Sequence, residues 1–267
     1  MLRILFFGDV MGRIGRRGVA AVLPHWKDRY RPDLIIANVE NLAHGKGVTM
    51  ATISEIQAAG VNVFTSGNHI FKKPEVYEII DDEKIALLRP ANYPPGVPGR
   101  GVVFVTVGTQ KLLVVNLLGR VFMNENLDCP FRAIDAILEE YKNVERAGTI
   151  VDFHAEATSE KVAFGLYVDG RVSAVLGTHT HVPTSDAEVL PGGTAYLTDA
   201  GMIGAKGTVL GVDKENIIHG FLTQQPVRHE IPESGTCIVN AVLVEIDENS
   251  QKALSIKQLR EEVEVVG

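Results

Sequence analysis

The chain has 267 residues, of which 45% are hydrophobic and 22% are charged, a composition typical of a globular protein with a large core. Its formal net charge of −7 argues against a surface for long nucleic acids, because such a surface needs Lys and Arg to neutralise phosphates. The only cysteines are Cys129 and Cys237, too few for a disulfide framework or a thiolate zinc site. No apolar run approaches the roughly 20 residues of a membrane span, and the first apolar run is too short for a signal peptide. We therefore expect a cytoplasmic protein with no membrane partner.

Apolar runs and helical patterns alternate over the first quarter of the chain. The order strand, helix, strand, helix, strand predicts a parallel sheet with right-handed crossovers. Pro24 lies inside the first predicted helix, where its missing N–H is unfavourable. The elements are expected at residues 2–7, 14–30, 34–38, 49–59 and 61–65.

The pattern changes after residue 89. Residues 89–101 are rich in Pro and Gly and predict an irregular loop, and residues 102–107 and 111–118 predict a hairpin. We expect one domain over residues 1–267, with a small cap or insertion within residues 89–130 as the alternative. A helix is expected at 130–143, and strands at 148–153, 172–176, 194–198, 237–246 and 254–264.

Residue types that bind metals follow five of the predicted strands. Open α/β sheets carry their sites at the carboxyl ends of strands, so these side chains are expected to meet. Oxygen and nitrogen ligands without thiolate suit iron, manganese or zinc. The residues are Asp9, Glu40, Asn41, Asn68, His69, His154, His179 and His181.

Each of these residues alone has a plainer interpretation. Asp9 would suit a helix N-cap, and a lone histidine is more often structural than a ligand. The pair His179-Thr-His181 is more specific, because imidazole is the commonest protein ligand for metals. His44 is a weaker candidate for a substrate contact. The other histidines, His25, His219 and His229, are expected to be structural or exposed.

The order of these motifs resembles that of the calcineurin-like metallophosphoesterases. Their signature runs Asp-x-His, Gly-Asp-x-x-Asp, Gly-Asn-His, a lone His and Gly-His-x-His. A more specific resemblance, to the YmdB-like branch, extends over nearly the whole chain. The matching motifs here are Gly8-Asp9-Val10-Met11, Asn38-Val39-Glu40-Asn41, Gly67-Asn68-His69, Asp152-Phe153-His154 and Gly177-Thr178-His179-Thr180-His181. The stretches that resemble the YmdB-like branch are 39–47, 89–92, 152–156 and 198–204.

Two positions depart from the general signature. Met11 replaces the histidine of Asp-x-His, and a thioether is a poor ligand for a hard ion. Glu40 replaces the usual bridging aspartate, and its neighbour Asn41 could supply a carboxamide oxygen in place of the missing histidine. The YmdB-like branch shares both changes, so they do not indicate an inactive site.

The resemblance implies a fold, a cofactor and a set of roles. The fold would be α/β, a metallophosphoesterase-type αββα sandwich of mixed sheets with flanking helices. The cofactor would be two metal ions, iron first and manganese or zinc as alternatives. Glu40 would bridge the ions, with Asp9, Asn41 and His181 on one ion and Asn68, His154 and His179 on the other. His69 would be the general acid.

The function that follows is a metal-dependent phosphoric ester hydrolase. The resemblance points to a phosphodiesterase that acts on cyclic nucleotides, including 2′,3′-cyclic ones, or on related small phosphodiesters, through hydroxide held between the metal ions. The alternatives are a nucleotidase-like phosphomonoesterase, or a regulatory or RNA-associated protein whose hydrolysis is incidental. A homo-oligomer is only the usual default. No aromatic clamp for a base is evident, and Tyr93, Phe122, Arg89, Arg100 and Arg120 are weak candidates for substrate contacts.

Overall fold

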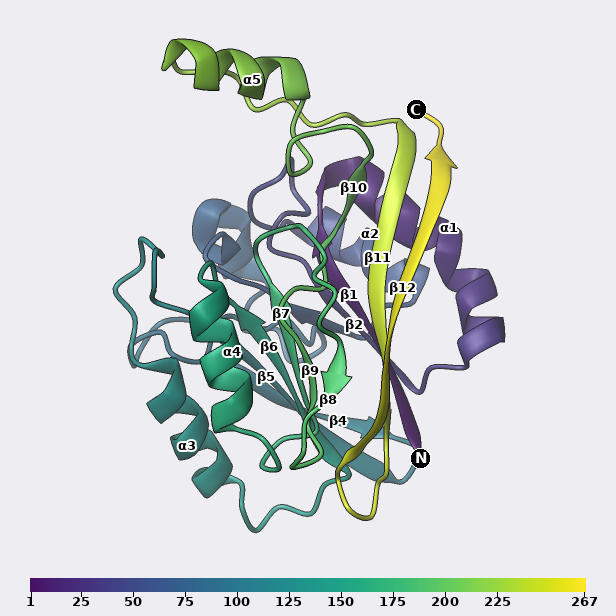
Figure 1. Ribbon diagram of the computed structural model, residues 1–267, viewed down its shortest axis with the longest axis vertical. Coiled ribbons are helices and arrows are strands. Elements are labelled where there is room, and N and C mark those ends of the chain that lie inside the picture. Colours follow the sequence, from purple (N-terminus) through teal and green to yellow (C-terminus); the bar gives the residue numbers. More distant parts are fainter.

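The computed structural model of the protein describes residues 1–267. Two six-stranded sheets pack face to face, and helices cover their outer faces (Figure 1). The strand orders are β12-β11-β10-β1-β2-β3 and β4-β5-β6-β7-β9-β8. The expected αββα sandwich of mixed sheets is therefore confirmed.

The first sheet begins with the three parallel strands that the apolar runs predict. On its other side, β10 runs parallel to β1, whereas β11 is antiparallel to both β1 and β12. The strands are β1 (Leu2–Val10), β2 (Leu34–Asn38), β3 (Val63–Thr65), β10 (Met202–Ala205), β11 (Gly235–Ile246) and β12 (Ala253–Val265), and the helices that follow β1 and β2 are α1 (Gly12–Tyr30) and α2 (Met50–Ala59). Two 3₁₀ turns, η1 (Ile70–Lys72) and η2 (Pro74–Glu78), follow β3.

The second sheet has a parallel centre, and its edge strands β4 and β8 are antiparallel. Its strands are β4 (Val102–Val107), β5 (Gln110–Leu118), β6 (Gly148–His154), β7 (Ala174–Thr178), β8 (Glu188–Val189) and β9 (Ala195–Leu197), and its helices are α3 (Pro130–Glu140) and α4 (Thr158–Tyr167). The remaining helix, α5 (Lys214–Thr223), buries no residue and stands away from both sheets (Figure 1).

Three apolar clusters separate the four layers. Successive residues of a strand point to opposite faces, so Leu5 and Phe7 of β1 pack under α1 and α2 while Ile4 and Phe6 pack between the sheets. A third cluster lies between the second sheet and helices α3 and α4. Because both faces of the central strands are covered, these strands are continuous apolar runs rather than alternating patterns.

Several expectations from the sequence need correction. The helix expected at 130–143 ends at Glu140, and the strand expected at 172–176 lies at Ala174–Thr178. Helices α4 and α5 and the short strands β8 and β10 were not predicted. Pro24 does not end α1, and its ring lies on the exposed side of that helix.

Within the segment considered as an insertion, β4 and β5 are part of the second sheet. None of the helices has the length and apolarity that crossing a bilayer requires.

The two cysteines are expected to differ in reactivity. Cys237 is fully buried in β11, and burial raises the pKa of its thiol to about 12, which suppresses the reactive thiolate. Cys129 is partly exposed. With a maleimide, we expect Cys129 alone to be labelled in the folded protein and both cysteines after unfolding in guanidinium, as read by mass spectrometry. Equal labelling of both thiols in the folded protein would contradict this packing.

Candidate metal centre

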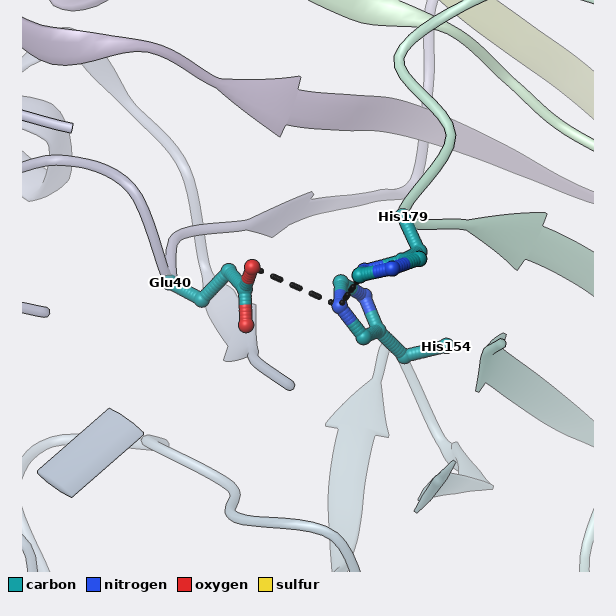
Figure 2. A group of neighbouring side chains, drawn as sticks. All are labelled: Glu40, His154 and His179. Carbon is teal, nitrogen blue, oxygen red and sulfur yellow. Dashed lines mark hydrogen bonds and ion pairs between the residues drawn. The ribbon is translucent and has the colours of Figure 1, made fainter. Parts of the chain in front are cut away.

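The carboxyl ends of strands from both sheets meet at one edge of the sandwich, and the predicted residues lie there. Asp9 is the penultimate residue of β1, and His154 ends β6. The others lie in the connections that follow β2, β3 and β7. Figure 2 shows three of these residues, Glu40, His154 and His179, whose ligand atoms all lie within 4.8 Å of one another.

These three side chains make direct contacts. Nε2 of His154 lies 3.4 Å from Oε1 of Glu40 and 3.0 Å from Nδ1 of His179 (Figure 2). The two imidazole rings meet edge to face, with centroids 4.7 Å apart. Three ligand atoms thus converge from β6, from the turn after β2 and from the turn after β7. This is a candidate site for a metal ion.

A second group extends the cluster toward β1. Oδ1 of Asp9 lies 3.8 Å from Nδ1 of His154 and 3.9 Å from Nε2 of His181. The same Nε2 of His181 is 3.3 Å from the amide nitrogen of Asn41. Asp9 and His154 are fully buried and Asn41 almost so, whereas His181 is partly exposed. The structure therefore brings Asp9, Asn41 and His181 to one side of the three-residue cluster.

His69 adjoins the centre from the side of β3. Its backbone N–H donates to Oε2 of Glu40 at 2.9 Å. Its Nδ1 lies 2.9 Å from Oδ1 of Asn41 and 3.3 Å from Oε1 of Glu40. The preceding Asn68 buries its Oδ1 without a hydrogen-bond partner. All eight predicted residues thus lie in one contiguous region.

Gly67 is required by the closeness of this packing. A Cβ at this position would lie 2.3 Å from Nε2 of His154 and 2.4 Å from Oε2 of Glu40. Real Cβ atoms do not approach other atoms so closely, and neither side chain is free to move in this packing. The glycine before Asn68-His69 therefore lets the end of β3 approach the side chains of the candidate centre.

The charges of the centre are strongly coupled. Burial opposes ionisation of Glu40, but His154 and His69 outweigh it and hold the pKa of Glu40 well below its ordinary value. Burial likewise opposes the charged form of His154, but the carboxylates of Glu40, Asp9 and Asp152 raise its pKa to about 9. Burial, with the nearby His154, lowers the pKa of His179 to about 3. Burial raises the pKa of Asp9 despite the nearby histidines, so it is the ionised Glu40 that requires positive charge here, which a proton or a metal ion can supply.

The donor set fits metal ions better than a purely structural hydrogen-bond network. Oδ1 of Asp9 and Oδ1 of Asn68 are both buried and make no hydrogen bond. An unpaired buried acceptor costs about 1–3 kcal/mol, so two of them among imidazoles and carboxylates indicate a missing partner. Hard oxygen ligands with imidazole nitrogens suit divalent metals such as iron, manganese or zinc.

A hydrogen-bond chain orients His154. Oγ1 of Thr178 donates to Oδ1 of the buried Asp152 at 2.7 Å and lies 2.9 Å from Nδ1 of His154. Because the hydroxyl proton goes to Asp152, the hydroxyl oxygen accepts the Nδ1 proton of His154. This arrangement leaves Nε2 as the atom that faces Glu40. Such hydrogen-bonded partners set the tautomer and direction of metal-binding histidines.

A buried ion pair holds the loop that carries the other two histidines. Nζ of Lys161 in α4 donates to Oδ2 of Asp199 and to the carbonyl of Thr178, both at 2.7 Å. The Asp199 carboxylate also accepts the N–H of Thr180 at 3.0 Å. Within this loop His179 and His181 have φ values of 101° and 66°, which are unfavourable for residues other than glycine. The ion pair therefore helps to fix a strained ligand loop.

These supporting residues were not identified from the sequence. Asp152 precedes His154 by two positions, so the strand period places both on one face, and that signal was available. Lys161 is buried in a helix that was not predicted, so nothing in its local pattern marked it. Glu156, which lies 3.1 Å from Nε2 of His179, was also missed. His44 instead lines a surface pocket with Arg16, Thr49 and Lys73.

The ion pair gives a prediction about stability. Lys161→Met leaves the Asp199 carboxylate buried without its cation, so we expect a loss of about 3–5 kcal/mol in the free energy of unfolding, measured by urea denaturation. Adding Asp199→Asn should recover part of that loss, because no charge is then left unpaired. The matched control is Lys142→Met, which breaks the exposed pair with Glu139 and should change stability by less than about 1 kcal/mol. Equal effects of the two lysine variants would refute the role of burial.

Comparisons with known proteins support the expected class of enzyme. The 2′,3′-cyclic-nucleotide 2′-phosphodiesterase of Bacillus subtilis (strain 168) is 46% identical over 259 residues, which cover 97% of this chain and 96% of that protein. A crystal structure of a novel phosphatase from Mycoplasma pneumoniae has a TM-score of 0.91 at 34% identity, covering 98% of this chain and 94% of the other. A hypothetical protein from Thermus thermophilus gives a TM-score of 0.90 at 43% identity, with coverage of 98% and 99%. A model of the YmdB-like protein family matches residues 5–259, and the chain belongs to that family.

Proposed function

We propose that the protein is a dinuclear metal-dependent phosphodiesterase that acts on cyclic nucleotides or related small phosphodiesters. The observation that carries the proposal is the convergence of two buried carboxylates, Asp9 and Glu40, with the imidazoles of His154, His179 and His181. The name of the Bacillus subtilis relative, a 2′,3′-cyclic-nucleotide 2′-phosphodiesterase, supports the substrate class.

The proposed ligands fall into two groups that share Glu40. One metal would be held by Asp9, Asn41 and His181, and the other by Asn68, His154 and His179, with iron as the first choice and manganese or zinc as alternatives. The contact of His154 with His179 supports the second group. Asp9, which lies 3.9 Å from His181 and 3.8 Å from His154, adjoins both groups. The unpaired oxygens of Asp9 and Asn68 provide one free acceptor for each group.

The charge balance favours an anionic substrate. Asp9 and Glu40 are the only formally negative ligands in the proposed set, so the loaded centre keeps a net positive charge. Two bound divalent ions would polarise the phosphoryl oxygens and lower the pKa of water for attack on phosphorus. Burial of the centre strengthens this attraction, because charges interact more strongly away from bulk water.

His69 is proposed to protonate the leaving oxygen. Its Nδ1 is hydrogen-bonded to Oδ1 of Asn41 and faces Glu40, so Nε2 is the atom available to a substrate. The side chain of His69 is 23% exposed, so substrate can reach it. General acids of this kind typically contribute about 10²–10⁴-fold to the rate.

A phosphomonoesterase remains a second candidate, because the similar Mycoplasma pneumoniae structure is described as a phosphatase. Turnover of bis-p-nitrophenyl phosphate and of p-nitrophenyl phosphate separates the two functions. The phosphodiesterase proposal requires a higher kcat/KM for the diester and hydrolysis of 2′,3′-cyclic nucleotides. A clear preference for the monoester would instead support a phosphatase.

Glu40→Gln should remove the shared ligand and abolish turnover with little loss of fold. The expected result is a metal content, measured by inductively coupled plasma mass spectrometry, that falls from two ions per chain toward one or none. The control is Glu233→Gln, which alters an exposed pair with Arg13 and should keep both ions and full activity. Normal turnover by the Glu40 variant would refute the dinuclear proposal.

His69→Ala should keep both metal ions, and the size of its loss of turnover should depend on the substrate. The loss should be about 10²–10⁴-fold for 2′,3′-cyclic nucleotides, whose alkoxide leaving group needs a proton, and much smaller for bis-p-nitrophenyl phosphate. The control is His219→Ala on the exposed surface of α5. If the His69 variant lost metal, His69 would be a ligand rather than the acid.

A further inference from the structure

Three aromatic side chains lie together in the chain segments that follow β3. The rings of Phe71 and Tyr77 are stacked with centroids 5.6 Å apart, and Tyr93 meets Phe71 edge to face at 5.5 Å. Phe71 and Tyr93 are partly buried, whereas Tyr77 is 56% exposed. We call Phe71, Tyr77 and Tyr93 the aromatic wall.

The wall is tied to the centre at two points of the chain. Phe71 follows His69 by two residues, in η1. Asn92, which precedes Tyr93, bonds both the N–H and the carbonyl of Leu118 at 2.9 and 2.8 Å. Leu118 pairs in register with His154. The wall is therefore anchored in two segments, one next to His69 and one bonded to the end of β5.

Tyr93 lies within the electrostatic field of nearby carboxylates. Burial, and then the carboxylates of Glu125 and Glu40, raise the pKa of Tyr93 to about 12. The Tyr93 hydroxyl thus lies within electrostatic reach of the proposed bridging carboxylate. Oε2 of Glu125 is buried and makes no hydrogen bond, so this acceptor lacks a donor.

Packing of the loop alone explains only part of this arrangement. Arg89 lies 5.9 Å from the centre of the Tyr93 ring and donates to the carbonyls of Pro90 and Pro98. Arg89 is thus occupied in fixing the loop and is not placed as the phosphate ligand considered from the sequence. Neither the exposed face of Tyr77 nor the unpaired oxygen of Glu125 serves this packing.

We propose that the aromatic wall binds the base of a nucleoside-bearing phosphodiester whose phosphate lies at the metal centre. The inference rests on the proposed phosphodiesterase function and narrows its substrate class. The base would stack on the exposed aromatic face, and Glu125 would accept an N–H or O–H of the nucleoside. Stacking tolerates any base, since every base has a π face, so the wall would select substrates that have a base over those without one.

The test compares two substrates that share the reacting group. One is 2′,3′-cyclic AMP, and the other is methyl ribofuranoside 2′,3′-cyclic phosphate, which has no base. Tyr77→Ala and Tyr93→Leu should each lower kcat/KM for cyclic AMP by about tenfold, mainly through KM, and leave the baseless substrate unchanged. The matched control is Tyr167→Ala, a partly exposed tyrosine of α4 that packs on Phe131, which should change neither substrate.

Binding of adenosine, which has no phosphate, gives a second readout that does not depend on turnover. Saturation-transfer NMR should show signals from the adenine protons of adenosine bound to the unmodified protein and to the Tyr167 variant. In the double variant Tyr77→Ala/Tyr93→Leu these signals should lose most of their intensity. Equal losses for both substrates, or adenine signals unchanged in the double variant, would overturn the inference. Failure of the unmodified protein to hydrolyse either substrate would count against the proposed function alone, because the adenosine experiment still tests the wall.

Discussion

The contact between the Glu40 carboxylate and the His154 imidazole is the interaction on which the site depends. It joins the two sheets, because Glu40 follows β2 of the first and His154 ends β6 of the second. Buried charges are costly unless they are paired, and here Asp9, the histidines and the proposed metal ions supply the pairing. The sheets must therefore pack with their carboxyl ends at one edge for the centre to exist.

Around this contact, a layer of buried polar residues holds the ligands in place. Asp152 and Thr178 orient one imidazole, while Lys161 and Asp199 hold the loop that carries the other two. Such residues are not among the proposed metal ligands, yet they set the directions in which the ligand side chains point. The backbone strain at His179 and His181 is tolerated because the surrounding packing fixes the loop.

The sequence predicted the central strands well, and the residues that it predicted for the centre lie together in the structure, because both depend on local signals. Continuous apolar runs marked the buried strands, and metal-binding residue types followed them at the expected strand ends. Helix α4 was missed although it packs on the second sheet. Helix α5 was missed although Ile217, Ile218, Phe221 and Leu222 follow a helical spacing, and none of them is buried. The two-sheet sandwich followed from the family resemblance and not from the periodicity, which indicated only a parallel sheet.

The sequence by itself determined which residue types gather at the centre, since order and spacing along the chain fix which residues follow each strand. The tertiary structure alone decided how they meet: that Glu40 lies against His154, that Asp9 and Asn68 keep unpaired oxygens, and that Gly67 admits the close approach. It also placed Phe71, Tyr77 and Tyr93 together. These contacts join segments that are far apart in the chain. Local sequence patterns do not contain the distances between such segments, because the packing of one sheet on another sets them.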